Sequence, residues 1–380
     1  MLLIAVAACG RIDFDAIDDA TAGDAITAVP IVQQVPCGAS IFLDTGGALI
    51  QDGFTWVHEP AMDWLIALEH VTETDHPVRR YAVESPGPGV VRIRDMGVMA
   101  TTEHAHSMIA EPVTAGYVMS YTEYYGGTAS AMLVTPDMVV TSTHPLGAWV
   151  AGGAGSTWFG RAGGGGLAAI GVVSSELHVR AVADDATPSS GFTVLAPVPD
   201  GPGLPTLAAL DVGLAAVWQS ATSGHCSVAM LRADLSIARG PVTLPVAACT
   251  DPQIAWLPGS RQIMVAAIDA NAGTLYAASW DDTLAPILAP MMIASSAKAP
   301  RIATDATGLW ITWADGSTPP SMRAAHLDPS GSISAQLGPL GMIDETVPHY
   351  QEIQRVAGSL VVLWMDVAQN RSLAATRLCP

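Results

Sequence analysis

A unit of about 50 residues recurs along most of this chain of 380 residues. Its clearest copies begin at Pro252-Gln-Ile-Ala and Pro300-Arg-Ile-Ala, which lie 48 residues apart. Each copy continues with a short turn, an apolar segment, a polar turn and a second, alternating segment. Copies of the first apolar segment are found at 64–68, 117–121, 214–218, 263–268, 309–313 and 360–364. Short apolar segments bounded by turn residues favour β-strands over helices.

Seven positions mark the first strand of each unit. They are spaced 47 to 52 residues apart, at Val57, Ile109, Phe159, Leu207, Ile254, Ile302 and Ile353. The 36 glycines and 27 prolines of the chain supply residues for many turns. Seven units of four short strands predict an all-β protein, folded as a seven-bladed β-propeller of four-stranded blades.

The two ends of the repeat predict how the ring closes. The last unit holds only three strands, at 353–356, 360–364 and 372–378, before the sequence ends at Pro380. A surplus strand at 39–44 (ASIFLD) precedes the first complete unit. We expect this N-terminal strand to complete the last blade, because the pairing closes the ring and removes an exposed edge.

Five cysteines can be placed on this topology: Cys9, Cys37, Cys226, Cys249 and Cys379. Cys379 ends the third strand of the last blade and Cys37 precedes the donated strand, so we expect these two to pair. Cys226 begins the third strand of the fourth blade and Cys249 follows its fourth strand, which predicts a second disulfide. Export would permit both bonds. No Cys-x-x-Cys spacing is present, which argues against a structural zinc site.

The N-terminal segment predicts where in the cell the protein is located. Residues 1–9 (MLLIAVAAC) resemble the end of a bacterial lipoprotein signal, in which small residues precede a cysteine that becomes lipidated, here Cys9. No positive region precedes it, which indicates a start codon upstream of Met1. Residues 10–36 predict an acidic, flexible tether and residues 37–380 the propeller domain. We therefore expect an exported outer-membrane or cell-envelope lipoprotein that faces the periplasm or the surface and touches the membrane only through its lipid. A buried strand with a stray cysteine is the alternative.

The segment Gly308–Ile333 (GLWITWADGSTPPSMRAAHLDPSGSI) resembles the repeat of secreted bacterial β-propeller proteins. In those repeats a strand ends in Trp plus an acidic residue, a polar turn follows, and the next strand ends in Leu-Asp-x-x-Gly. The resemblance implies the architecture and says little about activity. The chain lacks the Gly-His and Trp-Asp pair of WD-type repeats. It also lacks the full Ser-x-Asp-x-Gly-x-x-Trp box of sialidase-like propellers, which argues against a glycosidase.

Charge excludes one class of partner. The net charge is −19, and Lys298 is the single lysine. Binding to a phosphate backbone depends on neutralisation by Lys and Arg, so we expect no nucleic-acid partner.

Histidines form the best candidate cluster. His104 and His106 precede the first-strand marker of blade two, His349 precedes that of blade seven, and His58 lies beside that of blade one. We expect these four to lie near the channel mouth as ligand-binding candidates. His104, His106 and His349 are also candidate metal ligands, because His-x-His on an extended segment places both rings on one side. Channel-lining histidines bonded to backbone are the alternative.

No catalytic motif accompanies these histidines. The sequence has no Gly-x-Ser-x-Gly elbow, and Asp269-Ala-Asn-Ala-Gly273 is typical of a capped turn rather than a calcium loop. We therefore predict a monomeric envelope-anchored binding or interaction module for a protein or glycan ligand, with no cofactor and no assigned catalytic residue. The alternatives are a metal-assisted hydrolase or lyase that uses the histidine cluster, and a structural envelope component.

Overall fold

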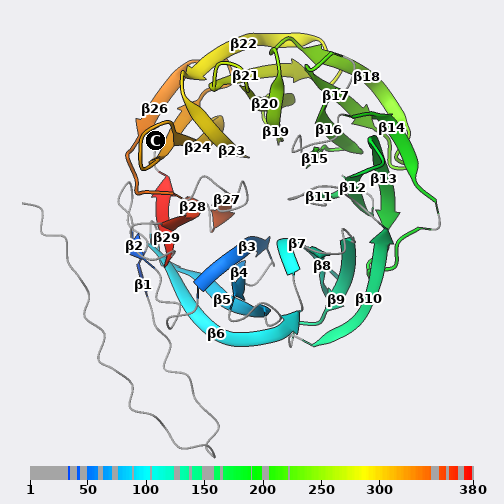
Figure 1. Cartoon of the computed structure of the whole chain (residues 1–380), viewed down its shortest axis with the longest axis vertical. Coiled ribbons are helices and arrows are strands. Elements are labelled where there is room, and N and C mark those ends of the chain that lie inside the picture. The colour runs from blue at the N-terminus through cyan, green and yellow to red at the C-terminus, as the bar shows by residue number, and fades with distance from the viewer. Residues whose placement is uncertain are drawn as a thin grey trace, which may run out of the picture.

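Seven β-sheets stand around a central axis in the computed structural model, which confirms the seven-bladed propeller (Figure 1). The structure describes residues 33–34, 41–42, 49–58, 63–70, 76–87, 90–102, 105–123, 129–136, 139–147, 158–162, 166–189, 191–198, 205–220, 223–343, 351–356, 359–366 and 372–378. Within these residues no helix is long and apolar enough to cross a membrane.

Each blade begins with an inner strand beside the axis and continues outward. The inner strands are β3 (Leu49–His58), β7 (Ala105–Val113), β11 (Trp158–Arg161), β15 (Thr206–Ala209), β19 (Cys249–Leu257), β23 (Ala297–Thr304) and β27 (Gln351–Val356). All seven first-strand markers of the sequence lie in these strands. The second strands are β4 (Asp63–His70), β8 (Gly116–Glu123), β12 (Leu167–Val173), β16 (Leu214–Gln219), β20 (Gln262–Asp269), β24 (Leu309–Asp315) and β28 (Ser359–Asp366).

The outer half of each blade is built in the same antiparallel order. The third strands are β5 (His76–Gly87), β9 (Ala129–Val134), β13 (Glu176–Val182), β17 (Cys226–Leu231), β21 (Thr274–Asp281), β25 (Met322–Leu327) and β29 (Ser372–Leu378). The outer strands of blades one to six are β6 (Val90–Thr102), β10 (Val140–Gly147), β14 (Thr193–Pro197), β18 (Ile237–Leu244), β22 (Pro286–Ala294) and β26 (Ile333–Leu337).

The N-terminal segment closes the ring as the sequence predicts. Strand β2 (Ile41–Phe42) pairs antiparallel with β29, with Ile41 opposite Ala375, and is the fourth strand of blade seven. A second strand, β1 (Gln33–Gln34), pairs with β6 and gives blade one a fifth strand. The sequence does not predict β1. Two separate contacts therefore join the N-terminal segment to the rims of blades seven and one.

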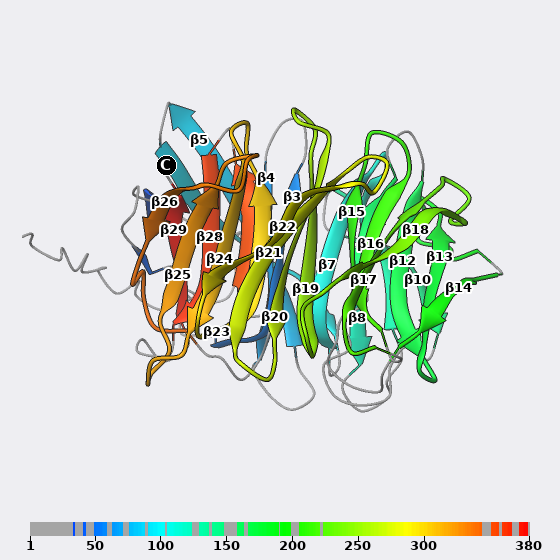
Figure 2. The same cartoon turned by 90° about the horizontal axis from the view of Figure 1, so that it is seen from above.

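The antiparallel order gives the disc two different ends (Figure 2). We call the end at which the inner strands begin the entry end. It carries the connections between blades and the turns between second and third strands. The other end, the exit end, carries the turns after the inner and the third strands.

The core lies between the blades. Among the described residues, six clusters of buried side chains each join two neighbouring blades, from the pair one–two to the pair six–seven. Middle strands are therefore buried on both faces: β20 is buried at every position except Asp269, whereas in the outer strand β22 only Ile293 is buried. This burial explains why middle strands have continuous apolar sequences rather than a clean alternation.

Tryptophans near the ends of second strands pack in these clusters. Trp218 contributes to the cluster of blades three and four, Trp313 to that of blades five and six, and Trp364 to that of blades six and seven. Each is at most 5% exposed. The sequence-based assignment of these residues to core packing is confirmed.

The disulfide between Cys226 and Cys249 is present, with the two Cα atoms 5.4 Å apart. Cys249 is the first residue of β19, so the bond joins the third strand of blade four to the inner strand of blade five. The predicted pair is correct, and it connects two blades. Cys9, Cys37 and Cys379 lie outside the described residues, so lipidation at Cys9 and the bond between Cys37 and Cys379 stay predictions.

We expect the Cys226→Ala/Cys249→Ala variant to keep the propeller fold but to lose about 3 kcal/mol of unfolding free energy. The bond joins residues 23 apart in sequence and restricts the unfolded chain, so its removal stabilises the unfolded state. Denaturant titration followed by tryptophan fluorescence measures the change. A variant with the parent's midpoint and slope would contradict this role.

Candidate functional site

The predicted histidine cluster is only partly placed. His106 is the second residue of β7, near the entry end, and His58 is the last residue of β3, at the exit end. Their side chains, and the whole of His104 and His349, lie outside what the structure describes. Within the described residues no three His, Cys, Asp or Glu side chains are grouped as metal ligands. The cluster and its metal chemistry stay predictions.

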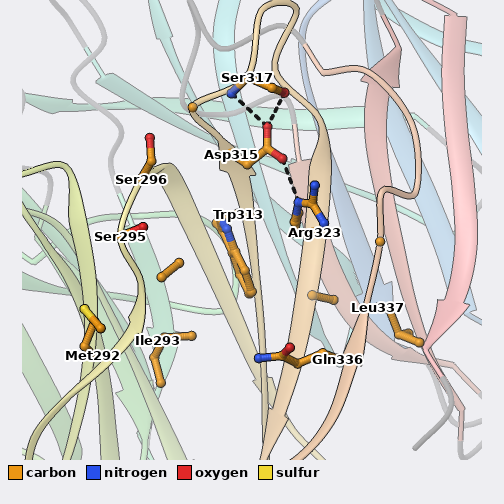
Figure 3. Close-up of a pocket in the computed structure, with 14 residues that line it drawn as sticks. Met292, Ile293, Ser295, Ser296, Trp313, Asp315, Ser317, Arg323, Gln336 and Leu337 are labelled. Carbon is orange, nitrogen blue, oxygen red and sulfur yellow. Dashed lines mark hydrogen bonds and ion pairs between the residues drawn. The ribbon is translucent and has the colours of Figure 1, made fainter.

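An open groove of about 770 Å³ lies at the entry end, between blades five and six (Figure 3). It is bounded by the connection from β22 to β23, by the turn after β24 and by the end of β26. We call it the blade 5–6 groove. Its lining residues are Met292, Ile293, Ala294, Ser295, Ser296, Trp313, Asp315, Gly316, Ser317, Arg323, Ala324, Gln336, Leu337 and Gly338. The volume is within the usual range for small-molecule pockets.

Asp315 is the most strongly bonded group in the groove. Its Oδ1 accepts hydrogen bonds from the backbone N–H groups of Ser317, at 3.1 Å, and Ser321, at 3.0 Å, and from the Ser317 hydroxyl. Its Oδ2 accepts the Nε–H of Arg323 at 2.6 Å. Burial alone would raise the pKa of Asp315, but these hydrogen bonds outweigh it and hold the pKa well below its ordinary value. Asp315 is therefore ionised across the physiological range.

Arg323 offers the groove its unused donors. Asp315 holds the Nε side of the guanidinium, and no described residue bonds to its two terminal nitrogens (Figure 3). The side chain is 40% exposed. Because the guanidinium is planar and fixed at one edge, its terminal N–H groups form an oriented fork that can bind an acceptor.

Blade seven shows why this groove is open. Trp364 and Asp366 occupy the positions that Trp313 and Asp315 occupy in blade six. There the preceding connection covers them: the Met342 N–H bonds to Asp366 Oδ2 at 3.0 Å, and Asp366 is 2% exposed. Gly341 approaches so closely that a Cβ there would lie 2.9 Å from Trp364.

In blade six the preceding connection is only Ser295 and Ser296, between the end of β22 and the start of β23. This short connection leaves the Arg323 side chain 40% exposed and the Asp315 side chain 14% exposed, although Trp313 stays buried. A short loop, rather than a missing side chain, therefore makes the groove.

Sequence reasoning missed Asp315 and Arg323 as site residues. Arg323 pairs across β24 and β25 with Trp313, and the residue opposite Trp364 in blade seven is Ala374. In blade four Ser227 stands opposite Trp218. The available signal was an arginine where two other repeats have a small residue.

A second cavity of about 570 Å³ lies at the exit end, beside the ends of three inner strands. It is lined by Ala208, Ala209, Trp256, Pro258, Gly259, Thr304, Asp305 and Ala306. Its polar groups are already bonded. The Trp256 indole donates to Asp211 at 3.1 Å, and the Thr304 hydroxyl donates to the Trp256 carbonyl at 3.1 Å. Little bonding capacity is left for a ligand.

Asp305, at the edge of this cavity, belongs to a network inside blade six. It accepts from the Trp310 indole at 3.1 Å and lies 3.3 Å from His326 Nε2, whose other ring nitrogen bonds to Ser334. The three residue types match a hydrolase triad, but Ser334 lies on the outer strand β26, away from both cavities. The network ties together the four strands of one blade.

Two glutamates on inner strands have raised pKa values. Burial raises the pKa of Glu111 to about 7, although Arg161 opposes the shift. Burial also raises the pKa of Glu352 to about 7, against the opposing effect of Arg301. Among the described residues, no hydrogen-bond donor contacts Glu111, so its charged form is poorly stabilised.

We expect Glu111→Gln to stabilise the protein by about 1–3 kcal/mol at pH 8 and to have little effect at pH 4. The pKa of Glu111 rises from its ordinary 4.5 to about 7 on folding, so its ionisation costs native stability increasingly as pH rises between these values. At pH 4 the native carboxyl is already neutral, and the amide replaces it closely. Urea titrations of both proteins at the two pH values give the difference. Equal effects at both pH values would contradict the shift.

Comparisons with known proteins support the fold. The WD40 domain of coronin from Toxoplasma gondii has a TM-score of 0.55 at 10% identity, covering 92% of this chain and 87% of its own. The periplasmic gluconolactonase PpgL of Pseudomonas aeruginosa has a TM-score of 0.53 at 14% identity, covering 75% and 84%. A Lactobacillus plantarum protein has a TM-score of 0.51 at 14% identity, covering 78% and 86%.

No protein-family model matches the sequence, and the comparison with curated proteins finds no match. The structural likenesses confirm the resemblance to bacterial β-propellers at the level of fold. At these identities they show the fold alone.

Proposed function

We propose that the chain is a binding module that takes a sugar residue of a glycan in the blade 5–6 groove. The observation that carries the proposal is the guanidinium of Arg323, fixed by Asp315 in an open groove with its terminal donors unused. The function is recognition, and the propeller serves as the rigid frame that holds the groove.

The lining has the two kinds of surface that a sugar needs. Trp313, Ile293 and the exposed Met292 supply apolar atoms for the ring carbons. Gln336, Ser295 and Ser296 are exposed polar side chains that can bond to hydroxyl groups. The groove thus offers a ligand both polar groups and apolar atoms.

The state of Asp315 favours binding over catalysis. A general acid or base works best with a pKa near the working pH, whereas the pKa of Asp315 is held far below its ordinary value. Its oxygens already accept four hydrogen bonds. Asp315 thus orients Arg323 and the turn around Ser317.

Filling the groove should abolish binding without unfolding the protein. We expect Ser295→Trp to remove the glycan signals that the parent gives on a microarray of neutral and acidic oligosaccharides, because the exposed Ser295 borders the groove. Ala233→Trp, at an exposed turn on the exit end, is the matched control. If both variants retain the parent's binding pattern, or if the parent binds no glycan, the proposal is wrong.

We further propose that Cys9 carries the lipid anchor that holds this module at the cell envelope, with residues 10–36 as part of the connecting segment. Support comes from the small residues before Cys9 and from the five Asp residues within 10–30.

The anchor predicts how the protein partitions. We expect the protein produced in bacteria behind a complete lipoprotein signal to enter the detergent phase, and its Cys9→Ser form to stay in the aqueous phase. Partition of both forms into buffer, or of both into detergent, would contradict lipidation at Cys9.

A further inference from the structure

The blade 5–6 groove contains an arginine, Arg323, whose charge is balanced by Asp315 but whose terminal N–H donors are not used. We infer that the group bound there is the carboxylate of an acidic sugar, such as a hexuronic acid residue. This inference rests on the proposed glycan-binding function and adds the identity of the group that contacts Arg323.

Asp315 has little capacity left to bond to the ligand's hydroxyl groups. Its Oδ1 accepts three hydrogen bonds from Ser317 and Ser321, and its Oδ2 accepts the Nε–H of Arg323. These contacts leave at most one acceptor position, on Oδ2, and the Asp315 side chain is only 14% exposed. The charged group of the groove with the most unused bonding capacity is therefore the donor Arg323.

The two terminal nitrogens of the Arg323 guanidinium favour an acceptor group that has two oxygens in one plane. Its two terminal nitrogens have no bond to any described residue, and the side chain is 40% exposed. Two N–H groups held in one plane match the two oxygens of a carboxylate and form a bidentate pair. Figure 3 shows the Nε of this guanidinium joined to Asp315 by one dashed line, with the two terminal nitrogens on the side away from that contact.

The charge of the site favours a singly charged group. Asp315 already offsets the charge of Arg323, so a doubly charged phosphate would lack a second cation in the lining. The whole chain also has a net charge of −19, which disfavours polyanions at long range. One carboxylate on an otherwise neutral ring leaves less uncompensated charge than a phosphate or a polyanion would.

Matched glycosides provide the test on the full chain. Calorimetry compares methyl glucuronide with methyl glucoside, methyl galacturonide with methyl galactoside, and glucose 6-phosphate with glucose. We expect at least one uronide to bind more tightly than its neutral partner by about tenfold or more, because a hydrogen-bonded charge contributes about 1.5–3 kcal/mol.

Variants then assign the preference to one side chain. Arg323→Gln should weaken binding of the uronide far more than binding of its neutral partner and so remove the preference, and Arg323→Lys should restore only part of it. Arg261→Gln is the control, because Arg261 also donates its Nε–H to an aspartate, Asp282, at 2.9 Å, but on the exit end. Circular dichroism of every variant confirms the fold.

The outcomes separate the two proposals. Equal binding of uronides and neutral glycosides, or tighter binding of the phosphate, overturns the carboxylate assignment and leaves glycan binding standing. A preference for uronide that survives Arg323→Gln also overturns it. Failure of every saccharide on the microarray and in calorimetry overturns both the proposed function and this inference.

Discussion

Burial of one blade's face against the next holds this molecule together. In the described part of the ring, each pair of neighbouring blades from one to seven shares a cluster of buried side chains. A single blade has no core of its own, so no blade is stable without its neighbours. This dependence makes closure essential, because an open ring would leave two apolar faces and two strand edges exposed. The pairing of β2 with β29 supplies that closure.

The turns of this architecture account for part of the chain's negative charge, so that part need not reflect binding of a ligand. After the third strands of blades three to six, an aspartate accepts the backbone N–H of the residue two positions on, at 2.7 to 3.0 Å; these are Asp185, Asp234, Asp281 and Asp328. These and neighbouring hydrogen bonds lower the pKa of all four carboxyls. Short polar turns favour Asp because its side chain can bond to its own backbone. Part of the negative charge therefore serves the turns.

The sequence predicts what periodicity and chain order control. Spacing located every inner strand, the N-terminal strand that completes blade seven, and the pair Cys226–Cys249. It did not predict β1, because a two-residue strand carries no periodic signal. It also missed the blade 5–6 groove. That site depends on how far the connection between two blades reaches across the second blade. The repeats that contain Trp313 and Trp364 have similar sequences. The connection that includes Met342 covers Asp366, whereas the shorter connection that includes Ser296 leaves Asp315 at the edge of the groove.

Amide hydrogen exchange in the presence of saturating methyl glucuronide or methyl galacturonide, whichever binds more tightly, tests whether the ligand occupies the blade 5–6 groove. We expect slower exchange at 292–296, 313–317 and 336–338, the three segments that border the groove. We expect no change at 104–106 and 349–353, where the histidine cluster was predicted. Protection confined to those two segments, with the three groove segments unchanged, would contradict binding in the groove.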